Sequence, residues 1–140
     1  MKKDFKKWHE LKSNIDEHRI APVFNEREIW WSALGANIGT EQDGKHELFE
    51  RPIIIIRKFN KELFWGVPAT LQKKGNEFHF PFTFSSIEQS AIVSQIRTLS
   101  AKRLIRRIGK LTDSQFEALR VAVGSLLIKR SGPLAESSGA

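Results

Sequence analysis

The chain has 140 residues, 40% of them hydrophobic and 28% charged, which suits one globular domain with a single core. It contains no cysteine, and this excludes disulfide bonds, thiolate nucleophiles and cysteine-ligated metals. The net charge of +7 suits a nucleic acid, an acidic protein or simply solubility, and without an apolar run of membrane-span or signal-peptide type we expect a cytoplasmic protein with no membrane partner.

Residues 3 to 18 are predicted to form a helix that packs on its own domain or binds a partner. Its apolar residues recur at spacings of three and four and therefore share one face: Phe5, Trp8, Leu11 and Ile15. Ala21-Pro22 is expected to end the helix, because the residue before a proline avoids the helical region.

The first predicted strand, residues 28 to 32, carries two adjacent tryptophans. Trp30 and Trp31 face opposite sides of such a strand, so one belongs to the core and the other either covers the sheet or stacks on a base. Three glycines punctuate the loop over residues 35 to 44, which is too long for a hairpin turn and is therefore predicted to be functional.

Ile53 to Ile56 predict a central strand that is buried on both faces, because four β-branched residues in a row cannot alternate between core and solvent. Pro52 suits the first residue of this strand, since proline has no N–H to donate. Arg51 is then fixed where the loop meets the sheet. It is either a working residue of a site or a salt-bridged surface arginine.

Residues 63 to 68 are predicted to form the antiparallel return strand, with Thr70 just beyond its end. Consecutive antiparallel strands bring the start of one near the end of the next, so Thr70 and Arg51 are expected to lie close together. By itself, a threonine hydroxyl in this place is an ordinary turn donor or a satisfied surface group.

Phenylalanines at alternate positions from 78 to 84 predict a half-buried strand whose rings pack in the core. Pro81 marks it as an edge strand, because a proline cannot donate to a neighbouring strand. His79 lies on the opposite face and has no second ligand at metal spacing, so we expect it to be solvated.

A last strand over residues 90 to 98 and a short basic helix over residues 100 to 109 are predicted next. Thr112 and Gln115 form a capping box, which predicts the start of a longer helix running to about residue 129.

These elements predict an α+β fold in one domain, residues 1 to 130. The N-terminal helix, about residues 3 to 18, is an extension of this domain, the strands form a small curled antiparallel sheet, and the two C-terminal helices follow. Residues 131 to 140 are small and polar and are expected to be a disordered tail.

The chain lacks a phosphate-binding glycine loop, a Gly-x-Ser-x-Gly elbow and a histidine pair spaced for zinc. A hydrolase made of these residues therefore works without a metal or a thiolate. RNA supplies its own nucleophile, the 2′-hydroxyl, if the protein orients the strand and stabilises charge on the phosphate. Arginine suits this task because its fork matches two phosphate oxygens, and threonine adds a neutral donor.

Five short motifs follow one another along the chain: Ile38-Gly39-Thr40-Glu41-Gln42-x-Gly44, Arg51-Pro52, Val67-Pro68-Ala69-Thr70, Ser94-Gln95-Ile96-Arg97-Thr98 and Arg103-Leu104. In this order and spacing they resemble the PemK/MazF toxins of bacterial toxin–antitoxin systems, over residues 27 to 128. The resemblance implies an SH3-like small antiparallel β-barrel, CcdB/PemK-like, that forms a homodimer. It also implies a sequence-specific endoribonuclease that cuts single-stranded RNA to 2′,3′-cyclic phosphate and 5′-hydroxyl ends, inhibits translation and growth, and is held inactive by a cognate antitoxin.

By position, the resemblance implies that Arg51 and Thr70 are catalytic, with neither a metal nor a cofactor. Substrate-binding residues are expected in the long loop and after the return strand: Glu41, Gln42, Gln72, Lys73 and Lys74. The loop before Arg51 is longer than in compact members of the family, and the helix before residue 20 lies outside the minimal fold.

Two other functions are consistent with such a barrel, a non-enzymatic toxin like the related gyrase poisons and a plain nucleic-acid-binding SH3-like module. The presence of Arg51 and Thr70 favours the nuclease. Because arginine is a poor proton acceptor, Glu41 or a water molecule is the candidate base for the 2′-proton.

Overall fold

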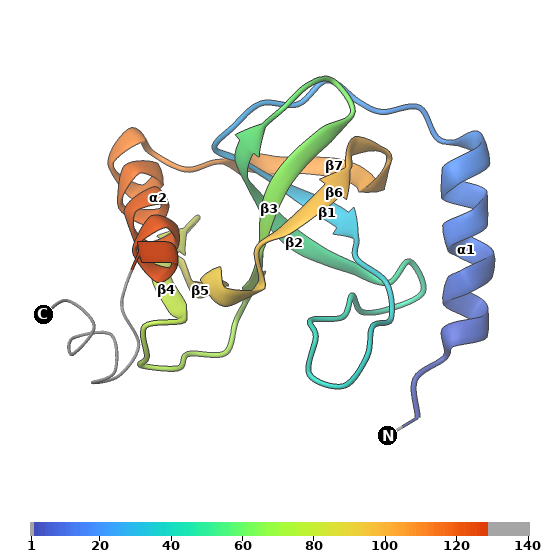
Figure 1. Ribbon diagram of the computed structural model, residues 1–140, viewed down its shortest axis with the longest axis horizontal. Coiled ribbons are helices and arrows are strands. Elements are labelled where there is room, and N and C mark those ends of the chain that lie inside the picture. The colour runs from blue at the N-terminus through green and yellow to red at the C-terminus, as the bar shows by residue number, and fades with distance from the viewer. Residues whose placement is uncertain (1, 129–140) are drawn as a thin grey trace, which may run out of the picture.

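The structure is a computed structural model and describes residues 2–128. In this part of the chain, seven strands form one antiparallel sheet system, with α1 and α2 at opposite ends of the molecule (Figure 1). The elements in chain order are α1 (Phe5–His18), β1 (Glu28–Ala33), β2 (Glu50–Lys58), β3 (Leu63–Thr70), β4 (His79–Phe84), β5 (Ile87–Ile92), the 3-10 turn η1 (Val93–Gln95), β6 (Arg97–Ser100), the 3-10 turn η2 (Ala101–Arg103), β7 (Leu104–Lys110) and α2 (Asp113–Ile128). The predicted α+β class is confirmed.

The strands are hydrogen-bonded in the order β4-β5-β3-β2-β1-β7, and β6 pairs with β3 off this path. Besides its pairing with β2, β3 divides its pairing between two further strands: residues 63–66 pair with β6, whereas Ala69 and Thr70 pair with β5. β6 and β7 lie at different edges and are joined only by the turn η2. The sheet therefore curls back on itself, as the predicted small barrel requires.

β2 is the central strand and is buried on both faces, as the four isoleucines predict. Ile53, Ile54 and Ile55 are 0% exposed and Ile56 is 7% exposed. Ile54 and Ile56 pack in the cluster that α2 covers, and Ile53 and Ile55 pack in the cluster on the other face. Each fully buried isoleucine contributes about 1.5–3 kcal/mol, so β2 holds both layers together and gives Arg51 a rigid support.

The adjacent tryptophans of β1 divide between the two faces as predicted. Trp30 is 6% exposed and belongs to the core. Trp31 is half-buried, and the guanidinium carbon of Arg106 lies 5.1 Å from its ring centroid. The contact with Arg106 is consistent with a ring that covers the sheet, and stacking of Trp31 on a base stays a prediction.

The alternating phenylalanines form β4, which is an edge strand as Pro81 indicates. Phe82 is buried, and Phe80 and Phe84 pack partly buried against the same cluster. Phe78 lies before the strand and is 44% exposed, so the core-packing prediction is wrong for this ring.

The strand predicted over residues 90–98 is interrupted, so this prediction is wrong in part. β5 ends at Ile92, the turn η1 follows, and β6 begins at Arg97. The physical reason is the division of β3, because β5 and β6 pair with different halves of it and the chain has to cross from one half to the other.

The basic helix predicted over residues 100–109 is wrong, and η2 and β7 occupy this stretch. The Ser100 hydroxyl caps η2 by accepting the N–H of Lys102 at 3.2 Å. β7 then pairs along β1 and satisfies main-chain groups that would otherwise form an open sheet edge. Pairing with a distant strand decides the conformation here, as is usual for strands.

The predicted N-terminal helix is confirmed as α1. The Asp4 carboxylate caps it by accepting the N–H of Lys7 at 3.0 Å. The helix ends at His18, before the predicted stop at residues 21–22, and Arg19 is already extended. Phe5 is 49% exposed, so it does not share the buried face as predicted.

The capping box of α2 is confirmed as well. The N–H of Gln115 donates to Thr112 Oγ1 at 3.2 Å, and the N–H of Thr112 donates to Gln115 Oε1 at 3.1 Å. No helix in residues 2–128 is long and apolar enough to cross a membrane. The predicted tail, residues 131 to 140, lies outside the described residues.

Candidate active site

Arg51 lies near the start of β2 and is only 7% exposed. Ile53 pairs with Pro68 across β2 and β3, so continuing this antiparallel register by two residues places Thr70 opposite Arg51. No ion pair to Arg51 forms among residues 2–128. The alternative of a salt-bridged surface arginine is therefore wrong.

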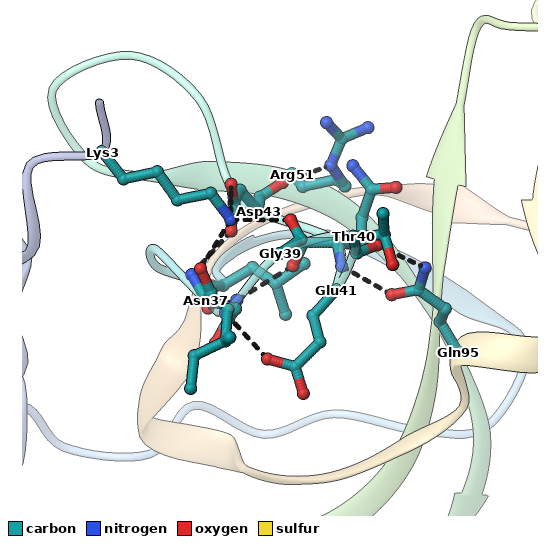
Figure 2. A network of polar contacts seen from close by, with 11 residues as sticks. Lys3, Asn37, Gly39, Thr40, Glu41, Asp43, Arg51 and Gln95 are labelled. Atoms are coloured by element: carbon teal, nitrogen blue, oxygen red, sulfur yellow. Dashed lines mark hydrogen bonds and ion pairs between the residues drawn. The ribbon is translucent and has the colours of Figure 1, made fainter. Parts of the chain in front are cut away.

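Two main-chain carbonyl oxygens hold the guanidinium of Arg51. Nε donates to the carbonyl of Asp43 at 2.6 Å (Figure 2), and Nη1 donates to the carbonyl of Ala69 at 3.2 Å. The amide oxygen of Gln42 accepts from Nη2 at 2.7 Å in the amide orientation that satisfies both groups. Burial lowers the pKa of Arg51 from its usual value, and the Asp43 carboxylate raises it in part. Arg51 is thus a fixed cation whose direct partners are neutral.

Thr70 is half-buried at the end of β3, one residue after the carbonyl that Arg51 contacts. Its Oγ1 accepts the N–H of Gln72 at 3.2 Å. A hydroxyl that accepts in this way still has its own proton to donate. The structure therefore places a cation and a hydroxyl donor at neighbouring strand ends.

The loop between β1 and β2 and the turn before β6 enclose a pocket of about 320 Å³. The residues that line this loop pocket are Asn37, Thr40, Glu41, Gln42, Ser94, Gln95 and Arg97. Glu41 and Gln42, both predicted to bind substrate, lie together in it. Arg51 does not line the pocket and reaches it through Gln42.

Gln95 and Arg97 also line this pocket, and neither was among the predicted site residues. Gln95 Oε1 accepts the N–H of Gln42 at 2.6 Å, and its Nε2 donates to the carbonyl of Thr40 at 3.2 Å (Figure 2). Burial lowers the pKa of Arg97, and the nearby Glu41 carboxylate raises it in part. The available signal was the motif over residues 94–98, which contains both side chains.

Glu41 is exposed at the rim of the loop pocket. Its Oε1 accepts the N–H of Ile38 at 2.8 Å, which orients the carboxylate (Figure 2). An exposed carboxylate at the rim of a pocket, close to Arg97, is a candidate proton acceptor for a bound group.

Gln72, Lys73 and Lys74 lie apart from the loop pocket, on the exposed stretch between β3 and β4. Lys73 forms an ion pair with Glu88 of β5. Lys73 and Lys74 line a separate hollow of about 620 Å³ beside β4 and β5. The structure therefore divides the predicted substrate-binding residues between two surfaces, with Thr70 between them in the chain.

The described residues contain no group of three or more His, Asp or Glu side chains placed to hold a metal ion. What the site contains is a buried cation, a hydroxyl and a rim carboxylate. These groups are able to stabilise negative charge on a phosphate and to move a proton.

Comparisons with solved structures show the same fold in bacterial toxins. MazF from Deinococcus radiodurans matches with a TM-score of 0.61 and 19% identity, covering 76% of this chain and 97% of that one. An endoribonuclease from a mycobacterial species matches with a TM-score of 0.56 and 14% identity, covering 84% of this chain and 100% of that one. The same kind of enzyme in complex with its cognate antitoxin matches with a TM-score of 0.57 and 14% identity, covering 80% of this chain and 100% of that one.

At these identities the structural matches establish the fold alone. A search of curated protein sequences gave no match. The sequence profile of the family described as "PemK-like, MazF-like toxin of type II toxin-antitoxin system" matches residues 25–127, which is most of the chain. The chain therefore belongs to the PemK-like and MazF-like toxins of type II toxin–antitoxin systems.

Proposed function

We propose that this protein is a metal-independent, sequence-specific endoribonuclease toxin that acts on single-stranded RNA in the cytoplasm and so inhibits translation and growth. The observation that carries the proposal is the setting of Arg51. It is a nearly buried cation held by the carbonyls of Asp43 and Ala69, without an ion pair among residues 2–128, next to the strand end that bears Thr70. Because the partners of this fixed cation are neutral, its positive charge is not neutralised and is available to stabilise an anionic ligand.

In the proposed reaction the RNA supplies the nucleophile. The 2′-oxygen forms a bond to phosphorus and the bond from phosphorus to the 5′-oxygen breaks, which leaves a 2′,3′-cyclic phosphate and a 5′-hydroxyl. Arg51 and Thr70 are the proposed catalytic residues. The Arg51 Nη2 group stabilises charge on one non-bridging oxygen and the Thr70 hydroxyl donates to the phosphate as a neutral donor.

The proton of the 2′-hydroxyl passes to the Glu41 carboxylate or to a water molecule, and the 5′-oxygen takes a proton from water. Arg51 is not the base in this scheme. Burial lowers its pKa, but arginine starts from so high a value that it stays protonated in proteins. Its proposed role is therefore electrostatic.

Gln42 is proposed to control whether an RNA phosphate reaches Arg51. Since Arg51 is 7% exposed and Gln42 accepts from its Nη2 group, a phosphate replaces the Gln42 oxygen when it binds. Glu41 and Gln42 then contact the RNA from the loop pocket, and Gln72, Lys73 and Lys74 bind it beyond Thr70. A strand that crosses Thr70 would touch both surfaces.

The proposed partners are a cognate antitoxin protein and a second copy of this chain. The mycobacterial relative of the same fold was solved with its cognate antitoxin, which supports an antitoxin partner here. The net charge of +7 suits both an RNA and an acidic antitoxin segment.

Incubation of the purified protein with a mixed RNA in EDTA tests the proposal against its alternatives. We expect discrete RNA fragments at a rate that EDTA does not change, because no metal takes part. Full-length RNA retained on the protein in a strongly salt-dependent way would instead indicate a nucleic-acid-binding module. RNA that is neither cut nor bound would indicate a non-enzymatic toxin.

A further inference from the structure

The helix α1 lies outside the family match, which begins at residue 25, yet it packs against the loop that carries Gln42 and Asp43. In Figure 1 this loop, between β1 and β2, lies on the side of the sheet that faces α1. The contacts made by residues 3–18 therefore indicate a role for this segment at the active site.

Lys3 holds the middle of the loop. Its ammonium group donates to the carbonyls of Asn37 at 2.5 Å and Gly39 at 3.0 Å, and it forms an ion pair with Asp43 Oδ2 at 3.0 Å (Figure 2). An ammonium has three protons to donate, so these three oxygens use its full donor capacity.

Trp8 holds both ends of the same loop. Its ring centroid lies 5.5 Å from that of Phe49, where the loop enters β2. At the other end, a Cβ on Gly35 would lie 2.2 Å from Cε2 of Trp8, so the helix packs against bare backbone there. Gly35 has a φ of 90°, which also favours glycine. The two ends are joined directly, because the N–H of Gly35 donates to the carbonyl of Phe49 at 3.1 Å.

Asp43 connects Lys3 to Arg51. Its Oδ1 accepts the N–H of Asn37 at 2.6 Å, its Oδ2 pairs with Lys3, and its carbonyl accepts from Arg51 Nε at 2.6 Å. The side chain is thus held on both oxygens while the main chain orients the guanidinium. We therefore expect that removing one of the side-chain contacts makes Asp43, whose carbonyl orients Arg51, more mobile.

From this arrangement we propose that the N-terminal segment is a clamp on the active-site loop, and that Lys3 is a positioning residue that orients Arg51 through Asp43. The proposal rests on the nuclease function proposed above. It adds a role for a segment outside the matched domain. Loss of the contacts between this segment and the loop slows the chemical step and leaves RNA binding nearly intact.

Lys3 is the right residue to change because the helix has other anchors. Ile15 is 7% exposed in the same cluster as Trp8. Lys102 Nζ donates to the carbonyl of Asp16 in α1 at 2.8 Å. Arg19 Nη2, just after the helix, donates to the carbonyl of Leu104 at 2.6 Å. The variant Lys3→Met therefore keeps the helix docked and removes only the contacts to the loop.

The experiment compares Lys3→Met with Lys6→Met, which removes the same charge three residues later, from an exposed position in the first turn of α1. We expect kcat for RNA cleavage to fall about tenfold in Lys3→Met with KM nearly unchanged, as is usual for a lost positioning contact. Hydrogen exchange of peptides covering residues 36–49 should become faster in this variant alone. Lys3→Arg, which keeps charge and donors, should restore most of the activity.

Unchanged exchange of this loop in Lys3→Met overturns the clamp. Faster exchange with a kcat that stays equal or rises overturns the positioning role. The exchange measurement needs no activity, so a wild-type protein that cuts no RNA refutes the nuclease function while the exchange data still decide whether the clamp exists.

Discussion

Replacing Arg51 with alanine is expected to lower kcat for RNA cleavage about 1000-fold, and Arg51→Lys is expected to lower it about 100-fold. Alanine removes the charge that is proposed to face the phosphate. Lysine keeps the charge but loses the planar fork, which donates to the carbonyls of Asp43 and Ala69 and is proposed to donate to the phosphate as well. Single-turnover cleavage of a defined RNA measures both effects.

Folding has to be separated from chemistry for this change, because Arg51 is nearly buried. The matched control is Arg57→Lys, the same exchange at an exposed position of the same strand, and it should cleave like the wild type. Circular dichroism and the thermal midpoint report whether each variant is folded. A folded Arg51→Lys protein with a kcat within threefold of the wild type would contradict the proposed role of the guanidinium.

Replacing Thr70 with valine should lower kcat about 100-fold, the usual effect of removing one donor from the charge that develops in a transition state. Valine has nearly the same shape, so β3 keeps its packing. The change also removes the acceptor for the N–H of Gln72 at a partly exposed turn, and we expect this to lower the free energy of unfolding by about 1 kcal/mol or less.

Two controls accompany this variant. Thr70→Ser keeps the hydroxyl and should retain activity within tenfold of the wild type. Thr98→Val makes the same exchange at an exposed position of β6 that lines neither the loop pocket nor the hollow beside β4 and β5, and it should not alter cleavage. Equal activity of Thr70→Val and Thr70→Ser would remove Thr70 from the reaction.

The parts of the fold with strong local signals could be predicted from the sequence. Four consecutive isoleucines are readable as a doubly buried strand, and the Thr112 and Gln115 pair is readable as a helix start, because each pattern has one physical solution. The proximity of Arg51 and Thr70 also follows from two consecutive antiparallel strands.

The stretch over residues 104–110 could not be predicted in the same way. Its sequence is compatible with a basic helix. Only its pairing with β1, a strand far earlier in the chain, makes it a strand, as the pair Glu28 and Lys110 shows. The same limit applies to the site. The burial of Arg51 and the contacts of Asp43 and Gln95 depend on how a long loop folds over distant strands, and no local pattern encodes that.

The nature of the RNA ends produced by the protein in EDTA tests the central claim most directly. A 2′,3′-cyclic phosphate on one fragment and a 5′-hydroxyl on the other, with no cutting where a single 2′-deoxynucleotide precedes the cleavage site, is the result expected from attack by the 2′-hydroxyl. Fragments that carry 5′-phosphates, or cutting that continues at the 2′-deoxy position, would contradict it, because water would then be the nucleophile.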